Sequence, residues 1–410
     1  MNKKSKSFIV FIAVLLTYTC LSACNNKGEV VAPAAEVEAS AVEEASLSDD
    51  TADNAVEEDT ESTVDDEKVT LKDIYAEHGI KAGTCISPSM ISAPAMEAII
   101  LEQFNSITPE NAMKTDFMIN KSKSIEAGDI VVEFNSDLIR ILDWAKANNM
   151  AVRGHNFIWH EQTPDWIFYE NFDPSGNLAS RDEMLSRMES YIRQVFEKLE
   201  KSGYIDMFYA YDVVNEAITD DGTMRDSKWK EVIGDDYVYY AFYYANMYAP
   251  ESIDLYYNDY NEQYKAGPVT RFVETLKDED GNYLIDGIGL QGHLYTQDDM
   301  NKYMLAVKKY GETGLKVEIT ELDVALGTWQ NVLDGSDENL KKQGVFFYNI
   351  INGVLEKIDE GSLNMDSITF WGFDDELSWK KQAKPLLYDK DLKPKYAFYG
   401  AAQVEDLAGF

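Results

Sequence analysis

The residue types best suited to chemistry in this sequence are acids, amides, histidines and tryptophans that follow short apolar runs. They are Glu110, Asn111, His155, Asn215, Glu216, Gln291, His293, Glu321, Asp323 and Trp371. A pair of carboxyl groups can hydrolyse a glycosidic bond, one acting as acid and base and the other as nucleophile or base. Tryptophan stacks on sugar faces, and amides bond sugar hydroxyls. This set of side chains therefore indicates carbohydrate chemistry.

Other reaction classes find little support in the same sequence. There is no G-x-S-x-G motif, and Cys85 lies beside no motif that would activate a thiol. His155 and His160 are five positions apart, which fits neither the H-E-x-x-H spacing nor one face of a strand. We therefore expect no metal site and no cofactor.

The elements that must position these residues alternate along the chain from about Val69 onward. The expected strands are 80–86, 104–108, 151–155, 207–214, 253–257, 287–291, 316–320 and 367–371, and the expected helices are 136–148, 181–202, 236–248, 269–276, 298–310 and 339–358. This alternation predicts a closed (β/α)8 TIM barrel, whose strands would bring the polar residues that follow them to one rim. A doubly wound open sheet is the alternative, weakened because no Gly-rich phosphate loop follows the first strand.

Seven motifs resemble glycoside hydrolase family 10, which consists mainly of endo-1,4-β-xylanases on a (β/α)8 barrel. In chain order they are TPENAMK (Thr108–Lys114), RGHNFIWHEQTPDW (Arg153–Trp166), YDVVNEA (Tyr211–Ala217), GIGLQGH (Gly287–His293), EITELDV (Glu318–Val324), TFWGFDDELSW (Thr369–Trp379) and KPLLYDKDLKPKYAFYG (Lys384–Gly400). The resemblance covers the chain from about Val69 to its end, with the motifs in family order.

The resemblance implies that Glu216 is the general acid/base and Glu321 the nucleophile. The two carboxyls are then expected about 5–5.5 Å apart, with net retention of anomeric configuration. His293 resembles the family residue that bonds the nucleophile and is held by Asp323. Asn215 resembles the amide that bonds the 2-hydroxyl of the sugar at the cleavage site.

Further residues are expected by resemblance to bind substrate. Those on the non-reducing side and its subsites are Glu110, Asn111, Lys114, His155, Trp159, Gln162 and Gln291. Trp371 and Trp379 are expected to wall the cleavage region, and Asn258 and Tyr260 to contact the leaving-group side.

Other chemically capable residues are interpreted as structural. These are His78, Trp144, Trp229, Trp329 and the aromatic run 237–248, whose helical spacing favours packing against the barrel. The role of His160 is left open. So is that of Asp374-Asp375-Glu376, which could shape subsites or disfavour acidic substrate decorations.

Three functions remain in competition. The first is a tethered endo-1,4-β-xylanase acting on xylan or xylo-oligosaccharides. The second is another retaining barrel glycosidase, such as an endo-β-glucanase. The third is a non-catalytic glycan-binding lipoprotein, which the intact Glu216, Glu321, His293 and Asp323 argue against.

The first 24 residues are typical of a secretion signal, because three lysines precede a short apolar run and then Leu21-Ser22-Ala23-Cys24. The last four residues resemble a bacterial lipobox, in which Cys24 is acylated and tethers the protein without spanning the membrane. An ordinary secretory signal is the alternative. We expect an exported cell-envelope lipoprotein, at the outer membrane, with the leaflet left open.

Acidity is concentrated after this signal. The chain carries a formal net charge of −36, and residues 25–68 have no aromatic residue and only Lys27 and Lys68 as bases. Such a segment is expected to be a disordered tether, followed by the catalytic domain at 69–410. The negative charge argues against nucleic acid as a partner. Cys20 would leave with the signal and Cys24 would carry lipid, so Cys85 is the only free thiol expected; no intrachain disulfide is expected, and a monomer is assumed.

Overall fold

The computed structural model describes residues 70–404 together with 406 and 407. The predicted signal at 1–24, its Cys24 and the predicted tether at 25–68 lie outside the described residues. Among the described helices, none is both long enough and apolar enough to cross a membrane.

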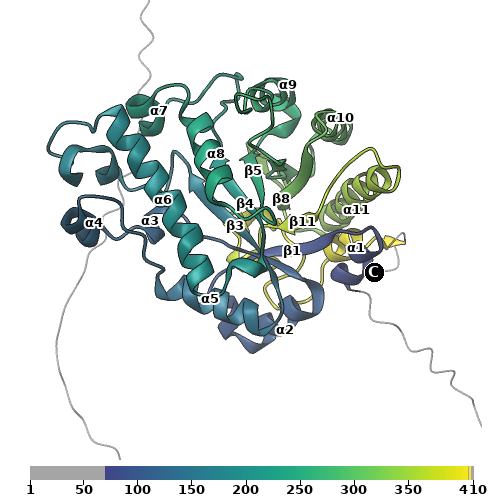
Figure 1. The fold of residues 1–410 in the computed structure, drawn as a ribbon. Coiled ribbons are helices and arrows are strands. Elements are labelled where there is room, and N and C mark those ends of the chain that lie inside the picture. The colour runs from purple at the N-terminus through teal and green to yellow at the C-terminus, as the bar shows by residue number, and fades with distance from the viewer. Residues whose placement is uncertain (1–69, 405, 408–410) are drawn as a thin grey trace, which may run out of the picture. The chain divides into compact units, whose positions relative to one another are not determined.

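Eight parallel strands close into a barrel, as the alternating pattern predicted (Figure 1). They are β1 (Lys81–Ile86), β2 (Ser106–Pro109), β3 (Ala151–Ile158), β4 (Phe208–Asn215), β5 (Asp254–Asp259), β6 (Gly287–Leu290), β8 (Lys316–Ala325) and β11 (Ser367–Phe370). Closure comes from the pairing of β11 with both β1 and β8, in which Ile368 lies opposite Ile319. The open-sheet alternative is therefore excluded.

All eight predicted strands are present; their starts agree with the prediction within two residues, and the largest differences lie at their C-terminal ends. A short strand β7 (His293–Tyr295) follows β6 after Gly292, whose φ of 71° breaks the run, and pairs with the outer part of β8. Two residues per strand form the small hairpin of β9 (Gly327–Thr328) and β10 (Asn331–Val332), which was not predicted.

Helices surround the strands in Figure 1. They are α1 (Leu71–Glu77), α2 (Pro94–Gln103), α3 (Thr115–Met118), α4 (Lys121–Ala127), α5 (Ser136–Ala147), α6 (Arg181–Lys201), α7 (Lys228–Ile233), α8 (Tyr237–Tyr248), α9 (Glu262–Val273), α10 (Met300–Gly311), α11 (Asp337–Asp359) and α12 (Tyr396–Ala401). Side-chain caps fix several starts: Asn135 accepts from Leu138 N–H before α5, and Ser180 from Glu183 N–H before α6.

One predicted helix is misplaced. Residues 269–276 were expected to be helical, but α9 begins at Glu262 and ends at Val273. The structure carries the helix through Pro268, so it begins about two turns before the predicted start, next to the end of β5.

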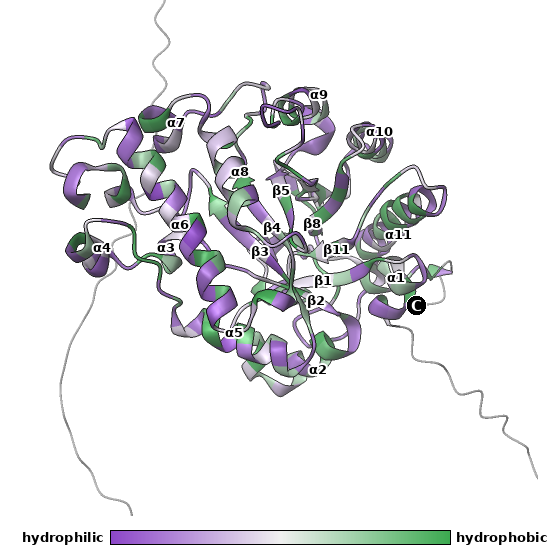
Figure 2. Ribbon diagram, viewed as in Figure 1, coloured by the Kyte–Doolittle hydropathy of each residue, from purple (hydrophilic) through white to green (hydrophobic). Residues whose placement is uncertain are grey.

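The hydrophobic core lies between the strands and the helices. Figure 2 shows hydrophobic and hydrophilic stretches alternating along α5 and α6, as expected for amphipathic helices that bury one face. Small residues permit close packing in the barrel wall, because a Cβ at Gly154 would lie 2.3 Å from the ring of Tyr211. Of the aromatic run, Tyr237 and Tyr244 are buried as predicted, whereas Tyr243 is exposed.

Charged groups occupy the inside of the barrel. Arg153 Nε donates to Glu318 Oε2 at 3.0 Å, and Arg153 Nη2 donates to Asp212 Oδ1 at 2.6 Å. All three side chains are buried. Burial would raise the pKa of Asp212, but the Arg153 guanidinium and the hydrogen bond with His155 hold it below its usual range. An ionised carboxylate therefore lies directly beneath the rim where β3 and β4 end.

Candidate active site

A cleft of about 1100 Å³ opens at the C-terminal ends of the barrel strands. Twelve of the predicted site residues line it: Glu110, Lys114, His155, Trp159, Asn215, Glu216, Tyr260, Gln291, His293, Glu321, Trp371 and Trp379. They come from segments spread over more than 250 positions of sequence, and barrel closure brings them together.

Four predicted site residues are not among those that line the cleft. Asn111 and Gln162, expected to bind substrate, are partly exposed, and both accept hydrogen bonds from Lys114 Nζ, at 3.1 and 2.7 Å. Asn258 was expected on the leaving-group side, yet its side chain is fully buried below the two carboxyls. Asp323, predicted as support for His293, is buried as well.

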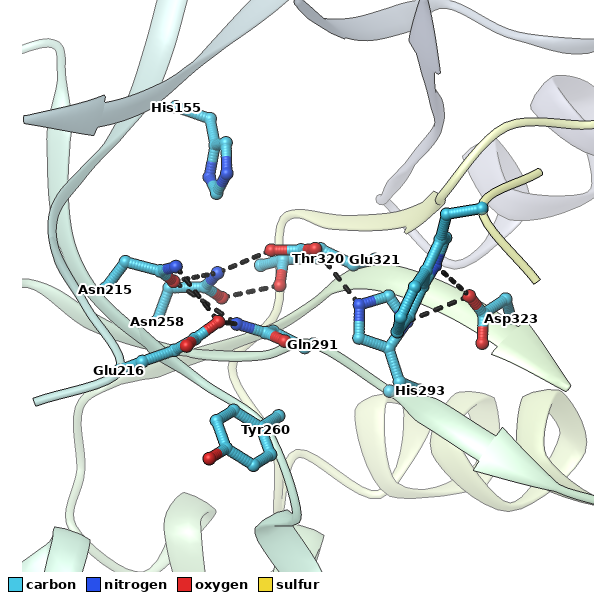
Figure 3. A network of polar contacts seen from close by, with 12 residues as sticks. His155, Asn215, Glu216, Asn258, Tyr260, Gln291, His293, Thr320, Glu321 and Asp323 are labelled. Carbon is cyan, nitrogen blue, oxygen red and sulfur yellow. Dashed lines mark hydrogen bonds and ion pairs between the residues drawn. The ribbon is translucent and has the colours of Figure 1, made fainter. Parts of the chain in front are cut away.

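Glu321 is held by donors on both of its oxygens (Figure 3). Asn258 Nδ2 donates to Oε1 at 2.7 Å, and His293 Nε2 donates to Oε2 at 3.2 Å. Burial would raise the pKa of Glu321, but the hydrogen bond from His293 and the positive charges of His155 and His293 hold it below its usual range. The carboxylate is thus ionised and fixed in orientation.

His293 owes its charge to Asp323. Its Nδ1 donates to Asp323 Oδ2 at 2.9 Å. Burial lowers the pKa of His293, but the charge of Asp323 and its hydrogen bond outweigh this and raise the pKa to about 9. Asp323 is fixed in turn by Lys380 Nζ at 2.9 Å and by Trp379 Nε1 at 3.1 Å. At neutral pH an imidazolium therefore lies between two carboxylates and can donate to both.

Glu216 is held by neutral groups instead. Gln291 Nε2 donates to its Oε1 at 2.9 Å, and Asn215 Nδ2 does so at 3.3 Å. His160 Nε2 lies 4.0 Å from the other oxygen. Burial and the charge of Arg225 lower the pKa of His160, so this ring tends to be neutral. Among the described residues, the hydrogen-bond donors that reach the Glu216 carboxyl are therefore these two amides.

The backbone of Glu216 is strained, with a φ of 58° in the left-handed region. Such a conformation costs a non-glycine residue about 1–3 kcal/mol unless its surroundings impose it. Glu216 N–H donates to the carbonyl of Asn258 at 2.9 Å, and Arg225 Nε donates to the carbonyl of Glu216 at 2.7 Å. Both peptide groups of the residue are therefore pinned.

Three buried side chains hold the next turn of chain, and we call Tyr257, Asp259 and Lys265 the acid clamp. Ile218 N–H donates to Tyr257 Oη at 3.0 Å, and Lys265 Nζ donates to the carbonyl of Ile218 at 3.0 Å. Asp259 accepts from both Tyr257 Oη and Lys265 Nζ. Both peptide groups of Ile218 are thus bonded by the acid clamp, whose side chains come from β5 and α9 and are themselves buried.

Several of these residues escaped sequence reasoning. Arg225, Lys380 and the acid clamp act on the catalytic region through other residues, and such roles leave no motif. Glu262 is another case: its buried carboxyl accepts from Gly292 N–H at 2.6 Å and so fixes the junction that places Gln291 and His293. Lys380 follows Trp379 directly, so its neighbour in the motif was the available signal.

Two interpretations of other residues change with the structure. Trp329, interpreted as structural, lines the cleft and is 79% exposed. Asp374 and Asp375 are buried in their own loop, where Asp375 pairs with Lys395 at 2.9 Å, so neither lines the cleft. In contrast, Trp144 and Trp229 are structural as predicted, since both pack against the hydrophobic core, and Cys85 is a buried free thiol. Within residues 70–404, 406 and 407, no group of three acids, histidines or cysteines could hold a metal ion.

Comparison with known proteins identifies the relatives of this chain. A family model described as Glycosyl hydrolase family 10 matches residues 70–404. Endo-1,4-beta-xylanase B of Butyrivibrio fibrisolvens is 35% identical over 81% of this chain, but the chain spans only 52% of that relative's length. Endo-1,4-beta-xylanase A of Caldicellulosiruptor saccharolyticus is 33% identical, and the match covers 73% of this chain and 86% of the relative.

Solved structures share the fold. A crystal structure of the N-terminal endo-1,4-beta-D-xylanase 10B modules of Clostridium thermocellum, complexed with xylohexaose, superposes with a TM-score of 0.75. It is 32% identical in sequence, and the match covers 84% of this chain and 69% of that chain.

The contact between His293 and Glu321 can be tested without substrate, by measuring the pKa of Glu321 in a His293 variant. Replacing His293 with Gln removes the positive charge that holds the pKa of Glu321 down, so the pKa of Glu321 rises. A ¹³C NMR titration of Glu-labelled protein measures this, with the Glu321 signal assigned from its absence in Glu321→Gln.

His78→Gln is the matched control, because His78 also pairs with a carboxylate, Asp359, at 2.8 Å, but lies outside the cleft. The Glu321 signal should titrate in this control as in the unchanged protein. A Glu321 signal that titrates at the same pH in His293→Gln would contradict the electrostatic role of His293.

Proposed function

The chain belongs to glycosyl hydrolase family 10, and on that premise we propose that it is an endo-1,4-β-xylanase that hydrolyses internal bonds of xylan with retention of configuration. The observation that carries the proposal is that two carboxyls in one cleft have different hydrogen-bond partners. Glu321 is kept ionised by a charged His293, while Glu216 is bonded only by neutral amides. A nucleophile and an acid that must gain and lose a proton need these two environments.

In the first step Glu216 donates its proton to the glycosidic oxygen while Glu321 attacks the anomeric carbon. The bond to the leaving chain breaks, and a covalent glycosyl-enzyme forms on Glu321. Because His293 and Asn258 hold the two oxygens of Glu321, the carboxylate needs little reorganisation before it attacks.

In the second step Glu216, now ionised, takes a proton from water. The water oxygen attacks the anomeric carbon from the face that the leaving chain occupied, and Glu321 is released. Two inversions give net retention. Asn215, bonded to both Asn258 and Glu216, is in position to bond the 2-hydroxyl of the reacting sugar, as the family resemblance implies.

Cleft residues on both sides of the carboxyl pair support an endo-acting enzyme. In Figure 3 His155 and Tyr260 lie on opposite sides of Glu216 and Glu321. Trp371 stands against His155 with ring centroids 5.3 Å apart, and Tyr260 is joined by Tyr264 on the other side. A chain bound across the pair would therefore be cut at an internal bond. The relatives named as xylanases favour xylan over a β-glucan.

Activity assays test this proposal directly. We expect reducing sugar to be released from xylan in large excess over carboxymethylcellulose, and ¹H NMR to detect the β-anomer first. Glu321→Ala and Glu216→Ala should each reduce kcat on xylan by roughly 10²-fold or more, since each removes a group that bonds or protonates the reacting atoms.

Glu279→Ala, in an exposed loop outside the cleft, is the control and should act like the unchanged enzyme. Release of the α-anomer first, or full activity in Glu321→Ala, would refute the mechanism. A preference for carboxymethylcellulose would favour the β-glucanase alternative.

The acid clamp predicts a selective defect in protonation. Tyr257→Phe removes the hydroxyl that accepts from Ile218 N–H, so Glu216 should be less well placed as an acid. We expect kcat/KM to fall by roughly tenfold for xylan, a fraction of what positioned proton transfer contributes, and little for a dinitrophenyl β-xylobioside. The dinitrophenolate leaves without protonation, so that substrate reports folding and nucleophile function.

Tyr256→Phe is the matched control. Tyr256 is the neighbouring buried tyrosine on β5, and its hydroxyl has no hydrogen-bond partner among the described residues. It should leave both substrates unaffected. Equal losses of Tyr257→Phe on both substrates would mean that the clamp supports the fold rather than the acid.

The N-terminal sequence supports a second part of the proposal, that the enzyme is exported and anchored to the cell envelope through acylated Cys24. The support is the charged start, the apolar run and the lipobox-like Leu21–Cys24, followed by an acidic segment able to act as a spacer. An anchored xylanase would act at the envelope, where its product oligosaccharides are released close to the cell.

Labelling with a radioactive fatty acid tests the anchor. The full chain, expressed in a bacterium that processes lipoproteins, should incorporate label and partition with membranes, whereas Cys24→Ser should lose both. Cys20→Ser is the control, because Cys20 lies within the removed segment and should leave labelling intact. Label retained in Cys24→Ser would refute acylation at that residue.

A further inference from the structure

The β9–β10 hairpin projects from the end of β8 and is firmly anchored. Gly327 N–H donates to Thr296 Oγ1 at 2.9 Å, and Gln297 N–H donates to the carbonyl of Gly327 at 3.1 Å. Gly327 has a φ of 101°, and a Cβ there would lie 2.1 Å from the carbonyl oxygen of Asn331. Only glycine permits this tight hairpin at position 327. The two hydrogen bonds tie the hairpin to the loop after β7.

The tip of this hairpin presents Trp329 to the cleft. Thr328, Trp329 and Gln330 all line the cleft, and Trp329 at 79% is the most exposed large hydrophobic side chain among the described residues. Burying an indole is favourable, yet the indole of Trp329 is left exposed on an anchored hairpin. A flat apolar surface is therefore held in water at the wall of a substrate cleft.

The hairpin belongs to the half of the cleft wall that is built by β5, β7 and β8. It is bonded to the loop after β7, and the cleft wall on this half of the barrel includes Tyr260, Tyr264 and Tyr295. The other half of the barrel supplies His155, Trp159 and Trp371. Tyr260, expected on the leaving-group side, lies on the side of the carboxyl pair away from His155 (Figure 3). The hairpin is bonded to the same half of the cleft wall as Tyr260.

We propose that Trp329 is a distal platform on the leaving-group side, which stacks on an undecorated pyranose of the β-1,4-linked chain beyond Tyr260. This rests on the proposed xylanase function and deepens it, because it predicts a preference for long chains. The indole is uncharged and flat, which suits the apolar face of a neutral sugar ring. Its contact is remote from the reacting bond, so it can contribute only when the leaving portion is long enough to reach it.

The test compares a long and a short substrate. In Trp329→Ala, kcat/KM for xylohexaose and linear xylan should fall about three- to tenfold, the range expected for one aromatic contact. For a dinitrophenyl β-xylobioside, whose leaving group is a single aryl ring, kcat/KM should change by less than about twofold. Cleavage of xylohexaose should shift away from bonds that leave the longest portion on the leaving-group side.

Trp329→Phe should recover most of the loss, because it retains a flat ring. Phe117→Ala, which removes an exposed aromatic residue outside the cleft, is the control and should leave both substrates unaffected. Trp329→Ala acting on xylohexaose like the unchanged enzyme, or losing activity equally on both substrates, would overturn the platform. If the unchanged enzyme cleaves neither substrate, the proposed function fails rather than the platform.

Discussion

The burial of an ionised Glu321 is the constraint on which the polar structure of the barrel mouth depends. A carboxylate taken from water needs opposite charge and hydrogen-bond donors, or it takes up a proton. Here the donors are Asn258 and a charged His293. His293 is charged because Asp323 is ionised, and Asp323 is ionised because Lys380 and His293 face it. Glu321, the proposed nucleophile, is thus the last member of a series of ion pairs that runs through His293 and Asp323 to Lys380, in the loop after β11.

The interior beneath this series of ion pairs follows the same logic. His155 bonds Asp212, and Asp212 bonds Arg153, which also bonds Glu318. The guanidinium of Arg153 thus lies between two buried acids below the cleft, and it holds the pKa of Asp212 below its usual range. The polar groups inside the barrel and those of the cleft are therefore connected, because His155 lines the cleft and also bonds the buried Asp212.

Glu216 and Glu321 are held in different ways, and the difference suits the catalytic roles proposed for them. As a nucleophile Glu321 stays ionised until it bonds the sugar, so a charged partner such as His293 does not hinder its proposed role. Glu216 must release and regain a proton in each cycle, and charged partners at its carboxyl would favour one state. Its side chain is accordingly bonded by neutral amides, while its backbone is held by Arg225, Asn258 and the acid clamp.

The sequence by itself determined the eight barrel strands, the rim that bears the polar residues and the two acids there, Glu216 after β4 and Glu321 within β8, because strand periodicity and family motifs are local signals. It did not determine that α9 continues through Pro268, that Asn258 lies beneath the cleft, or that Trp329 stands in its wall. Lys265 and Tyr257 carried no signal, because each acts through the backbone of Ile218, 47 and 39 positions away. Such contacts are decided only when the barrel closes, since burial and pairing between distant segments belong to the tertiary structure and not to any single stretch of chain.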